Sequence, residues 1–343
     1  MTPRVKTVAP WSGGKEAIGA EVWTRLGDPR HFIVPFAGML GVLRTRPTWR
    51  PGVRLCETVN DLDGGLSNAL RALAIAPEAV VDALTLRVGD EPDGDRTVRA
   101  ISELEQRAWA RELIASEADL RAQLAADPRW CDPELAAGWL WGASGWMGRG
   151  WPADVAQIPA ISARYGRGVH AKDGLQRVWM LARRLRHVRV LCGDWRRLVA
   201  SDAALGMGNR GMCPVAVFLD PPYGEGSGYQ AGEDGTGLAR EVWAWAVEAA
   251  QRWPELRIAV AGYEDGRDVP DGWVTLRWST RDRQRGAGRA RSTAAMARAD
   301  RETLWFSPAC LTPRVARQGS LFAIEPETVK RGQGERHRRP RSW

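Results

Sequence analysis

Several features that define whole classes of protein are scarce or missing in this 343-residue sequence. No apolar run approaches the roughly 18 to 20 residues that a membrane helix needs, so we expect no membrane span. Residues 1–10 lack a charged segment followed by an apolar one, which argues against a secretory signal and favours the cytoplasm. The five cysteines are widely spaced and never form a CxxC pair, so neither a disulfide framework nor a zinc site is expected.

Lysine is also scarce, since only four of the 49 basic residues are lysines. The formal net charge of +8 comes from two segments. Residues 281–301 contain seven arginines and two aspartates, and residues 329–343 contain one lysine and five arginines against one glutamate. Basic segments on a nearly neutral body favour contact with a nucleic-acid backbone, although a biased genome composition would also enrich arginine. We expect residues 326–343 to form a basic, disordered tail.

The sequence does contain a regular alternation of short apolar runs and helical stretches. Apolar or β-branched runs that end in Gly, Asp or Pro predict seven strands, at 32–35, 53–59, 188–191, 215–219, 256–261, 274–278 and 303–306. Helical periodicity follows or precedes some of them, at 66–76, 175–185 and 238–253. This alternation predicts an α/β protein with a mostly parallel sheet.

The alternation is interrupted over residues 85–172, which we interpret as an inserted second domain. A long polar helix is predicted at 97–126, and a Trp- and Gly-rich segment follows at 139–151. The tryptophans of that segment are more typical of core packing than of stacking on nucleic-acid bases. They are Trp139, Trp141, Trp146 and Trp151.

The tetrapeptide Asp220-Pro221-Pro222-Tyr223 directly follows the fourth predicted strand, at the end where open α/β sheets bind ligands. It suits methylation of an amino group conjugated to a flat ring, whose delocalised lone pair is a weak nucleophile. The Asp220 carboxylate and a backbone carbonyl held by proline can each accept one amino hydrogen. Tyr223 offers an aromatic face for a flipped-out base. The structural alternative is a Pro-Pro turn that simply ends the strand.

Four other segments suit a nucleotide-like ligand. Val34–Leu40 places Gly38 at a tight strand-to-helix turn, where the backbone can approach a ligand closely. Glu57–Asp63 ends the next strand with acids that can hold ribose hydroxyls, and Leu191–Trp195 ends the third with an acid before an aromatic. Trp11–Lys15 supplies an aromatic-x-G-G-K pattern that includes one of the few lysines. Each segment alone could be an ordinary turn or helix cap.

Taken together and in this order, these motifs resemble those of the Dam-like adenine-N6 DNA methyltransferases, particularly the short phage-type DNA adenine methylases. The resemblance extends from about Trp11 to Cys310. It implies a Rossmann-like, mostly parallel, seven-stranded methyltransferase sheet formed by residues 1–84 and 173–325. Residues 85–172 would then be an inserted, mainly helical target-recognition domain. The implied cofactor is S-adenosylmethionine, with no metal.

The resemblance also implies roles for individual residues. The catalytic residues would be Asp220, Pro221, Pro222 and Tyr223. The cofactor-binding residues would be Trp11, Lys15, Pro35, Phe36, Gly38, Asp61, Asp194, Trp195 and Asp220. Asp61 would be the ribose ligand, with Glu57 or Asp63 as its rivals, and Leu40 departs from the family pattern by replacing its third glycine.

Double-stranded DNA is the expected partner. The residues expected to contact it are Lys15, Tyr223, Arg281, Arg283, Arg285, Arg289 and Arg291, with sequence readout from the insert and the basic 281–301 segment. The predicted reaction moves a methyl group from S-adenosylmethionine to N6 of a flipped-out adenine, in a phage or restriction-modification setting. Cytosine-N4 DNA methylation, RNA base methylation and an inactive DNA-binding homologue are the alternatives. A monomer is favoured.

Overall fold

The computed structural model describes most of the first 313 residues. The described ranges are 5–11, 14–47, 55–88, 103–145, 168–207, 213–222, 235–278 and 302–313. The chain divides into two compact units, Met1–Thr312 and Pro313–Trp343. Every element named below belongs to the first unit, and the tail predicted at 326–343 lies outside the described residues.

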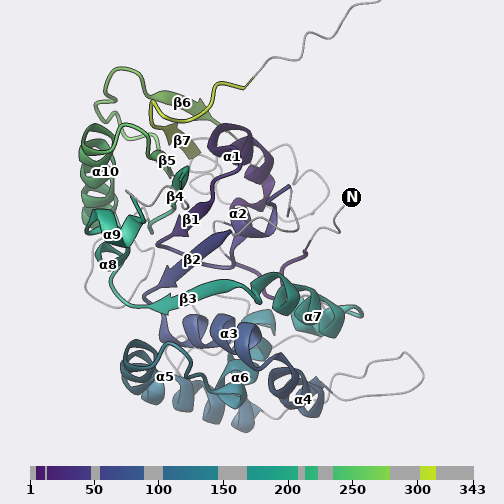
Figure 1. The fold of residues 1–343 in the computed structure, drawn as a ribbon. Coiled ribbons are helices and arrows are strands. Elements are labelled where there is room, and N and C mark those ends of the chain that lie inside the picture. Colours follow the sequence, from purple (N-terminus) through teal and green to yellow (C-terminus); the bar gives the residue numbers. More distant parts are fainter. Residues whose placement is uncertain are drawn as a thin grey trace, which may run out of the picture. The chain divides into compact units, whose positions relative to one another are not determined.

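A seven-stranded sheet runs through the first unit (Figure 1). Its strands are β1 (His31–Val34), β2 (Cys56–Asp61), β3 (Val188–Cys192), β4 (Val215–Leu219), β5 (Arg257–Tyr263), β6 (Val274–Arg277) and β7 (Glu302–Phe306). Each predicted strand overlaps one of these. The strands β1 to β5 pair in parallel, whereas β7 is antiparallel to both β5 and β6. The predicted mostly parallel, Rossmann-like α/β sheet is therefore confirmed.

The spatial order of the strands is β3-β2-β1-β4-β5-β7-β6. It departs from the order 3-2-1-4-5-6 of a dinucleotide-binding sheet because β7 lies, reversed, between β5 and β6. The chain builds outward from β1 through β2 to β3, and then returns to the other side of β1 to form β4 and β5. The topological switch point, where sheets of this kind bind ligands, therefore lies between β1 and β4.

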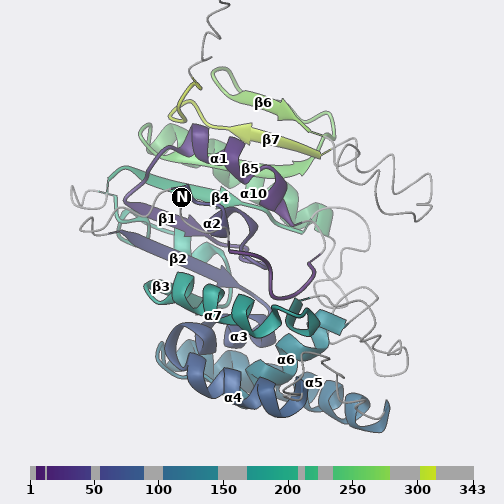
Figure 2. The same ribbon diagram turned by 90° about the vertical axis from the view of Figure 1, so that its right-hand side faces the viewer.

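Helices cover both faces of the sheet (Figures 1 and 2). The helices are η1 (Lys15–Ala17), α1 (Gly19–Leu26), α2 (Gly41–Arg44), α3 (Gly64–Ile75), α4 (Pro77–Val88), α5 (Glu103–Ala126), α6 (Pro133–Gly145), η4 (Gly168–His170), α7 (Gly174–Leu185), α8 (Arg196–Val199), α9 (Asp202–Leu205) and α10 (Gly235–Arg252). Successive strand residues point to opposite faces, so Phe32 packs with α1, α2 and α7, whereas Ile33 packs in the core of α8, α9 and α10. The predicted helices at 66–76, 175–185 and 238–253 correspond to α3, α7 and α10.

The helices α3, α4, α5 and α6 gather at the β3 end of the sheet in both views (Figures 1 and 2). The described part of the predicted insert, mainly α5 and α6, packs on α3 and α4 and shares a core with the strands. Trp139 and Trp141 are fully buried there, which confirms their core role, whereas Trp146 and Trp151 lie outside the described residues. The domain boundaries at 85 and 172 and the target-recognition role stay predictions. None of the described helices has the length and apolar character needed to cross a bilayer.

Candidate functional site

The carboxyl ends of the parallel strands bring most of the predicted site residues to one edge of the sheet. Gly38 follows β1, Asp61 ends β2, Asp194 follows β3, and Asp220 follows β4. Because these strands are parallel, the four positions share the edge at which the switch point opens. The sequence predicted this gathering, and the strand order confirms it.

Asp220 forms an ion pair with Lys15 at this edge. The Lys15 Nζ atom lies 3.1 Å from Asp220 Oδ1, and the lysine side chain is only 3% exposed. Burial raises the pKa of Asp220, whereas the charge and hydrogen bond of Lys15 lower it. The adjacent Pro221 is buried and Pro222 half-buried, while Tyr223 lies outside the described residues. The arrangement holds a carboxylate in a fixed position beside a buried cation.

A second carboxylate, Glu302, reaches the same lysine. Glu302 is the first residue of β7, and its Oε2 atom lies 4.0 Å from Lys15 Nζ with the side chain 13% exposed. Burial raises the pKa of Glu302, Lys15 lowers it, and the charge of Asp220 raises it further. Sequence reasoning missed Glu302, because it took no functional side chain from the beginning of a predicted strand. In the reversed strand β7 it is the first residue that lies at this edge.

Close backbone packing places Lys15. A Cβ atom on Gly41 would lie 2.9 Å from the backbone nitrogens of both Lys15 and Glu16, so only glycine fits between α2 and η1. The buried Arg44 of α2 reinforces this docking by donating to the Val5 carbonyl and to the Glu16 carboxylate. Gly41 was also missed by sequence reasoning, although it directly follows the Val34–Leu40 segment that was singled out.

Gly38 and Asp61 are joined directly. The backbone N–H of Gly38 donates to Asp61 Oδ2 at 3.0 Å, and that of Asp63 donates to Oδ1 at 3.2 Å. Gly38 has a φ of +46°, and a Cβ there would lie 2.7 Å from the indole nitrogen of Trp11. The N-terminal segment therefore contacts both halves of the site, through Trp11 at Gly38 and through Lys15 at Asp220.

Leu40 occupies the position where the family pattern has glycine. Its φ of 60° and ψ of 33° lie in the left-handed region that glycine adopts without strain. The side chain is nearly fully buried. Packing of the leucine side chain accordingly holds a backbone conformation that glycine would adopt freely.

The two rivals of Asp61 for the ribose have other roles. Glu57 lies at the amino end of β2, where its carboxylate accepts hydrogen bonds from Arg46 and Arg184. Glu57 is therefore not part of this site, because it is at the opposite edge of the sheet. Asp63 caps α3 by accepting from the Leu66 N–H at 2.7 Å, and its pKa is raised to about 7 by burial and by the charge of Glu117.

Glu117 of α5 also reaches this edge. Its carboxylate accepts from the backbone N–H groups of Gly64 at 2.8 Å and Gly65 at 3.2 Å, at the start of α3. A helix N-terminus favours negative charge, so Glu117 stabilises this end of α3. Glu117 thereby connects the predicted insert to the segment that carries Asp61, a contact that the sequence did not reveal.

The side chains of Asp194 and Trp195 lie in different environments, one at the surface and the other buried. Trp195 is 5% exposed and packs against Phe36 and Trp245, with ring centroids 5.8 and 6.0 Å apart respectively. Pro35, which precedes Phe36, is buried. Asp194 is half-exposed and accepts from the backbone and guanidinium of Arg196. The structure thus joins Trp195 to the β1 loop and leaves Asp194 at the surface.

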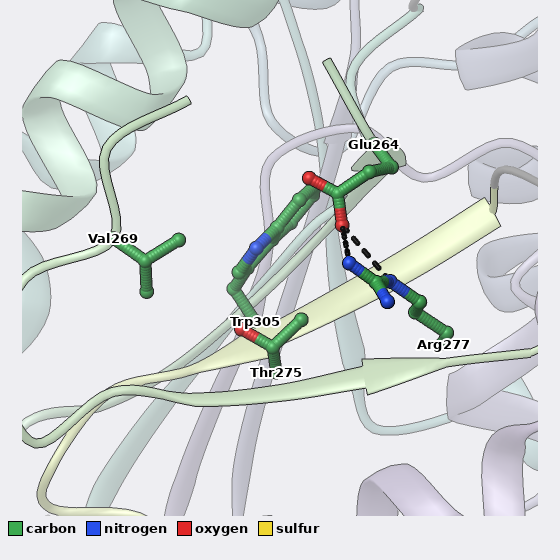
Figure 3. Close-up of a pocket in the computed structure, with 5 residues that line it drawn as sticks. All are labelled: Glu264, Val269, Thr275, Arg277 and Trp305. Atoms are coloured by element: carbon green, nitrogen blue, oxygen red, sulfur yellow. Dashed lines mark hydrogen bonds and ion pairs between the residues drawn. The ribbon is translucent and has the colours of Figure 1, made fainter. Parts of the chain in front are cut away.

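A hollow of about 500 Å³ opens elsewhere on the first unit, near β5, β6 and β7 (Figure 3). It is lined by Glu264, Val269, Thr275, Arg277 and Trp305. Glu264 and Arg277 form an ion pair across it, as Figure 3 shows. No predicted site residue within the described ranges lines this hollow. The arginines predicted to contact DNA, from Arg281 to Arg291, lie outside the described residues.

The chain matches no protein-family model, and it matches no curated protein. Function is therefore inferred from the sequence motifs and from the geometry of the described residues.

Proposed function

We propose that the protein is a DNA methyltransferase that transfers a methyl group from S-adenosylmethionine to the N6 amino group of a flipped-out adenine in duplex DNA. One observation carries the proposal: Asp220 is held by a buried lysine at the carboxyl end of β4, beside the switch point between β1 and β4 and at the same edge as the hydrogen-bonded Gly38 and Asp61. A rigid carboxylate followed by two prolines at this position is what amine methylation needs.

Asp220 has the central role in the proposed mechanism. Its carboxylate accepts one hydrogen of the substrate amino group, and a backbone carbonyl of the proline pair accepts the other. These bonds draw the nitrogen toward tetrahedral geometry and place negative charge where positive charge develops. Lys15 fixes the orientation of the carboxylate, which reduces the cost of aligning it with the substrate.

The cofactor would be held by the β1, β2 and β3 ends. S-adenosylmethionine, when bound, supplies an electrophilic methyl group on a sulfonium centre. The carboxylate of Asp61 suits the ribose hydroxyls, because carboxylate oxygens accept hydrogen bonds from hydroxyl groups and two backbone N–H groups hold these oxygens in place. Phe36 and Trp195 form an aromatic surface beside it, and the half-exposed Asp194 can accept from an amino group.

The ends of β6 and β7 support DNA contact at the same edge. Residues 279–301 lie outside the described residues, but they connect the end of β6 to the start of β7. Since β6 is parallel to β5 and β7 is reversed, both of these ends lie at the edge that carries Asp220. The arginine-rich segment is therefore attached at the edge to which a duplex would bring the flipped-out base. Each arginine contact to guanine would favour guanine over another base by about 1 to 3 kcal/mol.

The test uses purified protein, labelled S-adenosylmethionine and duplex DNA, followed by nucleoside analysis. We expect N6-methyladenine as the product and a loss of at least about 10²-fold in rate for Asp220→Ala. Near wild-type methylation by Asp220→Ala would refute the mechanism. Methylated cytosine, methylation of structured RNA only, or DNA binding without cofactor binding would each replace the proposal by the corresponding alternative. Sequencing of DNA from expressing cells then gives the sequence context.

A further inference from the structure

At the carboxyl edge of the sheet, the single ammonium group of Lys15 lies near two carboxylates. The ammonium lies within 4.0 Å of two carboxylates, Asp220 and Glu302, which come from different strands. All three side chains are buried or nearly so, with exposed fractions of 3%, 21% and 13% for Lys15, Asp220 and Glu302. Glu302 Oε2 is buried and accepts no hydrogen bond among the described residues. Burying a carboxylate oxygen without a hydrogen bond costs free energy of folding, so such a group is expected where its charge has a function.

We propose that Glu302 is a positioning residue of this site, whose carboxylate balances the charge of Lys15 so that Lys15 can orient Asp220 without cancelling its negative charge. The inference deepens the methyl-transfer proposal and rests on it for the reaction. The charge arrangement itself can be tested without any substrate.

The net charge of Lys15, Asp220 and Glu302 gives the physical reason for this role. A pair of Lys15 and Asp220 alone would be neutral, so the carboxylate would have little attraction left for positive charge developing on a substrate nitrogen. With Glu302 ionised as well, the three side chains carry one net negative charge. Such a charge, fixed in a site with little water, stabilises a developing cation more strongly than it would in water.

Neighbouring charged groups have other partners. Glu16, next to Lys15, pairs with Arg44, and Glu264, which follows β5, pairs with Arg277. Tyr263 is the residue opposite Glu302 in the β5–β7 ladder. Asp220 and Glu302 are thus the two carboxylates to follow as reporters of the Lys15 environment.

The decisive experiment uses the scarcity of lysine. With lysine labelled by ¹³C at the carbon next to the ammonium, the full-length protein gives four signals, from Lys6, Lys15, Lys172 and Lys330. Loss of one signal in Lys15→Met identifies Lys15. Between pH 4 and 9 we expect the wild-type Lys15 signal to shift in two steps, as two carboxyl groups titrate, and to shift in a single step in Glu302→Gln.

Glu264→Gln is the matched control, because it removes the same charge from the neighbouring strand but on the side that faces Arg277. Its Lys15 signal should keep both steps. Retained lysine signals and an unchanged unfolding temperature would show that each variant is folded. A Lys15 signal that titrates identically in the wild type and in Glu302→Gln would overturn the proposal.

Methyl transfer gives the second readout. We expect Glu302→Gln to lower kcat by about 10- to 100-fold with little change in KM for DNA. The acid limb of the pH profile should move to lower pH, because the remaining carboxylate loses a like charge beside it. Glu302→Asp should recover part of the rate. An unchanged profile despite a reduced rate would mean a merely structural role, whereas inactive wild-type protein with the expected lysine signals would refute only the proposed function.

Discussion

Two buried ionic clusters at opposite edges of the same sheet show how differently a carboxylate can be used. At the amino end of β2, Glu57 is shared by two arginines, Arg46 and Arg184, at distances of 2.6 to 2.8 Å. At the opposite edge, one lysine is shared by two carboxylates, Asp220 and Glu302. In the first cluster one carboxylate has two cationic partners, of which Arg46 also pairs with the exposed Asp28, whereas in the second cluster one cation has two carboxylate partners.

The pKa values differ in the same sense. Burial alone would raise the pKa of Glu57, but the hydrogen bonds and charges of Arg184 and Arg46 lower it below its ordinary value. For Asp220 and Glu302 burial prevails over the single lysine, and both pKa values are raised. A satisfied carboxylate stabilises the fold, whereas an incompletely compensated one is a candidate for chemistry.

The largest effect on stability should come from a substitution in the Glu57 cluster. Glu57→Gln removes the carboxylate that pairs with Arg184 and leaves Arg46 only its ion pair with the exposed Asp28, so we expect a loss of about 3 to 5 kcal/mol in the free energy of unfolding. Asp220→Asn should cost less than Glu57→Gln, because Lys15 keeps Glu302 as a partner. Urea denaturation of both variants measures the difference. Equal losses would remove the distinction between the two clusters.

The same contrast predicts a pH dependence. Because the pKa of Glu57 is lowered on folding, its contribution to stability is present at neutral pH and is lost as the pH falls through that lowered value. Glu57→Gln should therefore show a smaller decrease in stability on acidification than the wild type.

The packing that places Lys15 should have an intermediate effect. In Gly41→Ala the new Cβ collides with the backbone of Lys15 and Glu16, so we expect a loss of about 1 to 3 kcal/mol together with weaker methyl transfer. Gly138→Ala is the matched control, since nothing lies within 4 Å of a Cβ there. In the helix α6 that change should stabilise by about 0.5 to 1 kcal/mol. A Gly41→Ala protein with wild-type stability and activity would show that Lys15 does not depend on this packing.

Asp63 offers the most specific test. Burial and the charge of Glu117 raise its pKa to about 7, whereas the pKa of an aspartate in the unfolded chain is about 3.9. Between these values the folded protein binds more protons, so the wild type loses stability as the pH rises through this range. Asp63→Asn keeps a cap acceptor for Leu66 but cannot ionise.

We therefore expect Asp63→Asn to gain stability relative to the wild type between pH 5 and pH 8, by an amount on the order of 2 to 3 kcal/mol. Urea midpoints at the two pH values provide the measurement. A variant that is less stable than the wild type at pH 8 would mean that Asp63 is stabilising in its ionised form.

Much of the carboxyl edge of the sheet could be predicted, because short sequence patterns mark the ends of its strands. Apolar runs of four to seven residues that end in Gly, Asp or Pro predicted every strand of the sheet. The central strands β1, β4 and β5 are buried on both faces, which requires such runs. Parallel strands bring their carboxyl ends together, so the sequence pattern was enough to assign Gly38, Asp61 and Asp220 to one edge. Glu57 was weighed as a ribose ligand because it lies in the same short segment as Asp61.

The sequence by itself determined the strands, the class of sheet and the edge at which Asp220 lies, because hydrophobic period and turn residues act between neighbours in the chain. Only the tertiary structure decided that Lys15 and Glu302, from opposite ends of the described chain, lie within 4.0 Å of each other, and that Glu57 belongs to a different cluster from Asp61. Reversal of β7 and the close contact at Gly41 bring the first pair together. Contacts of this kind depend on how distant segments pack, and no local pattern specifies them.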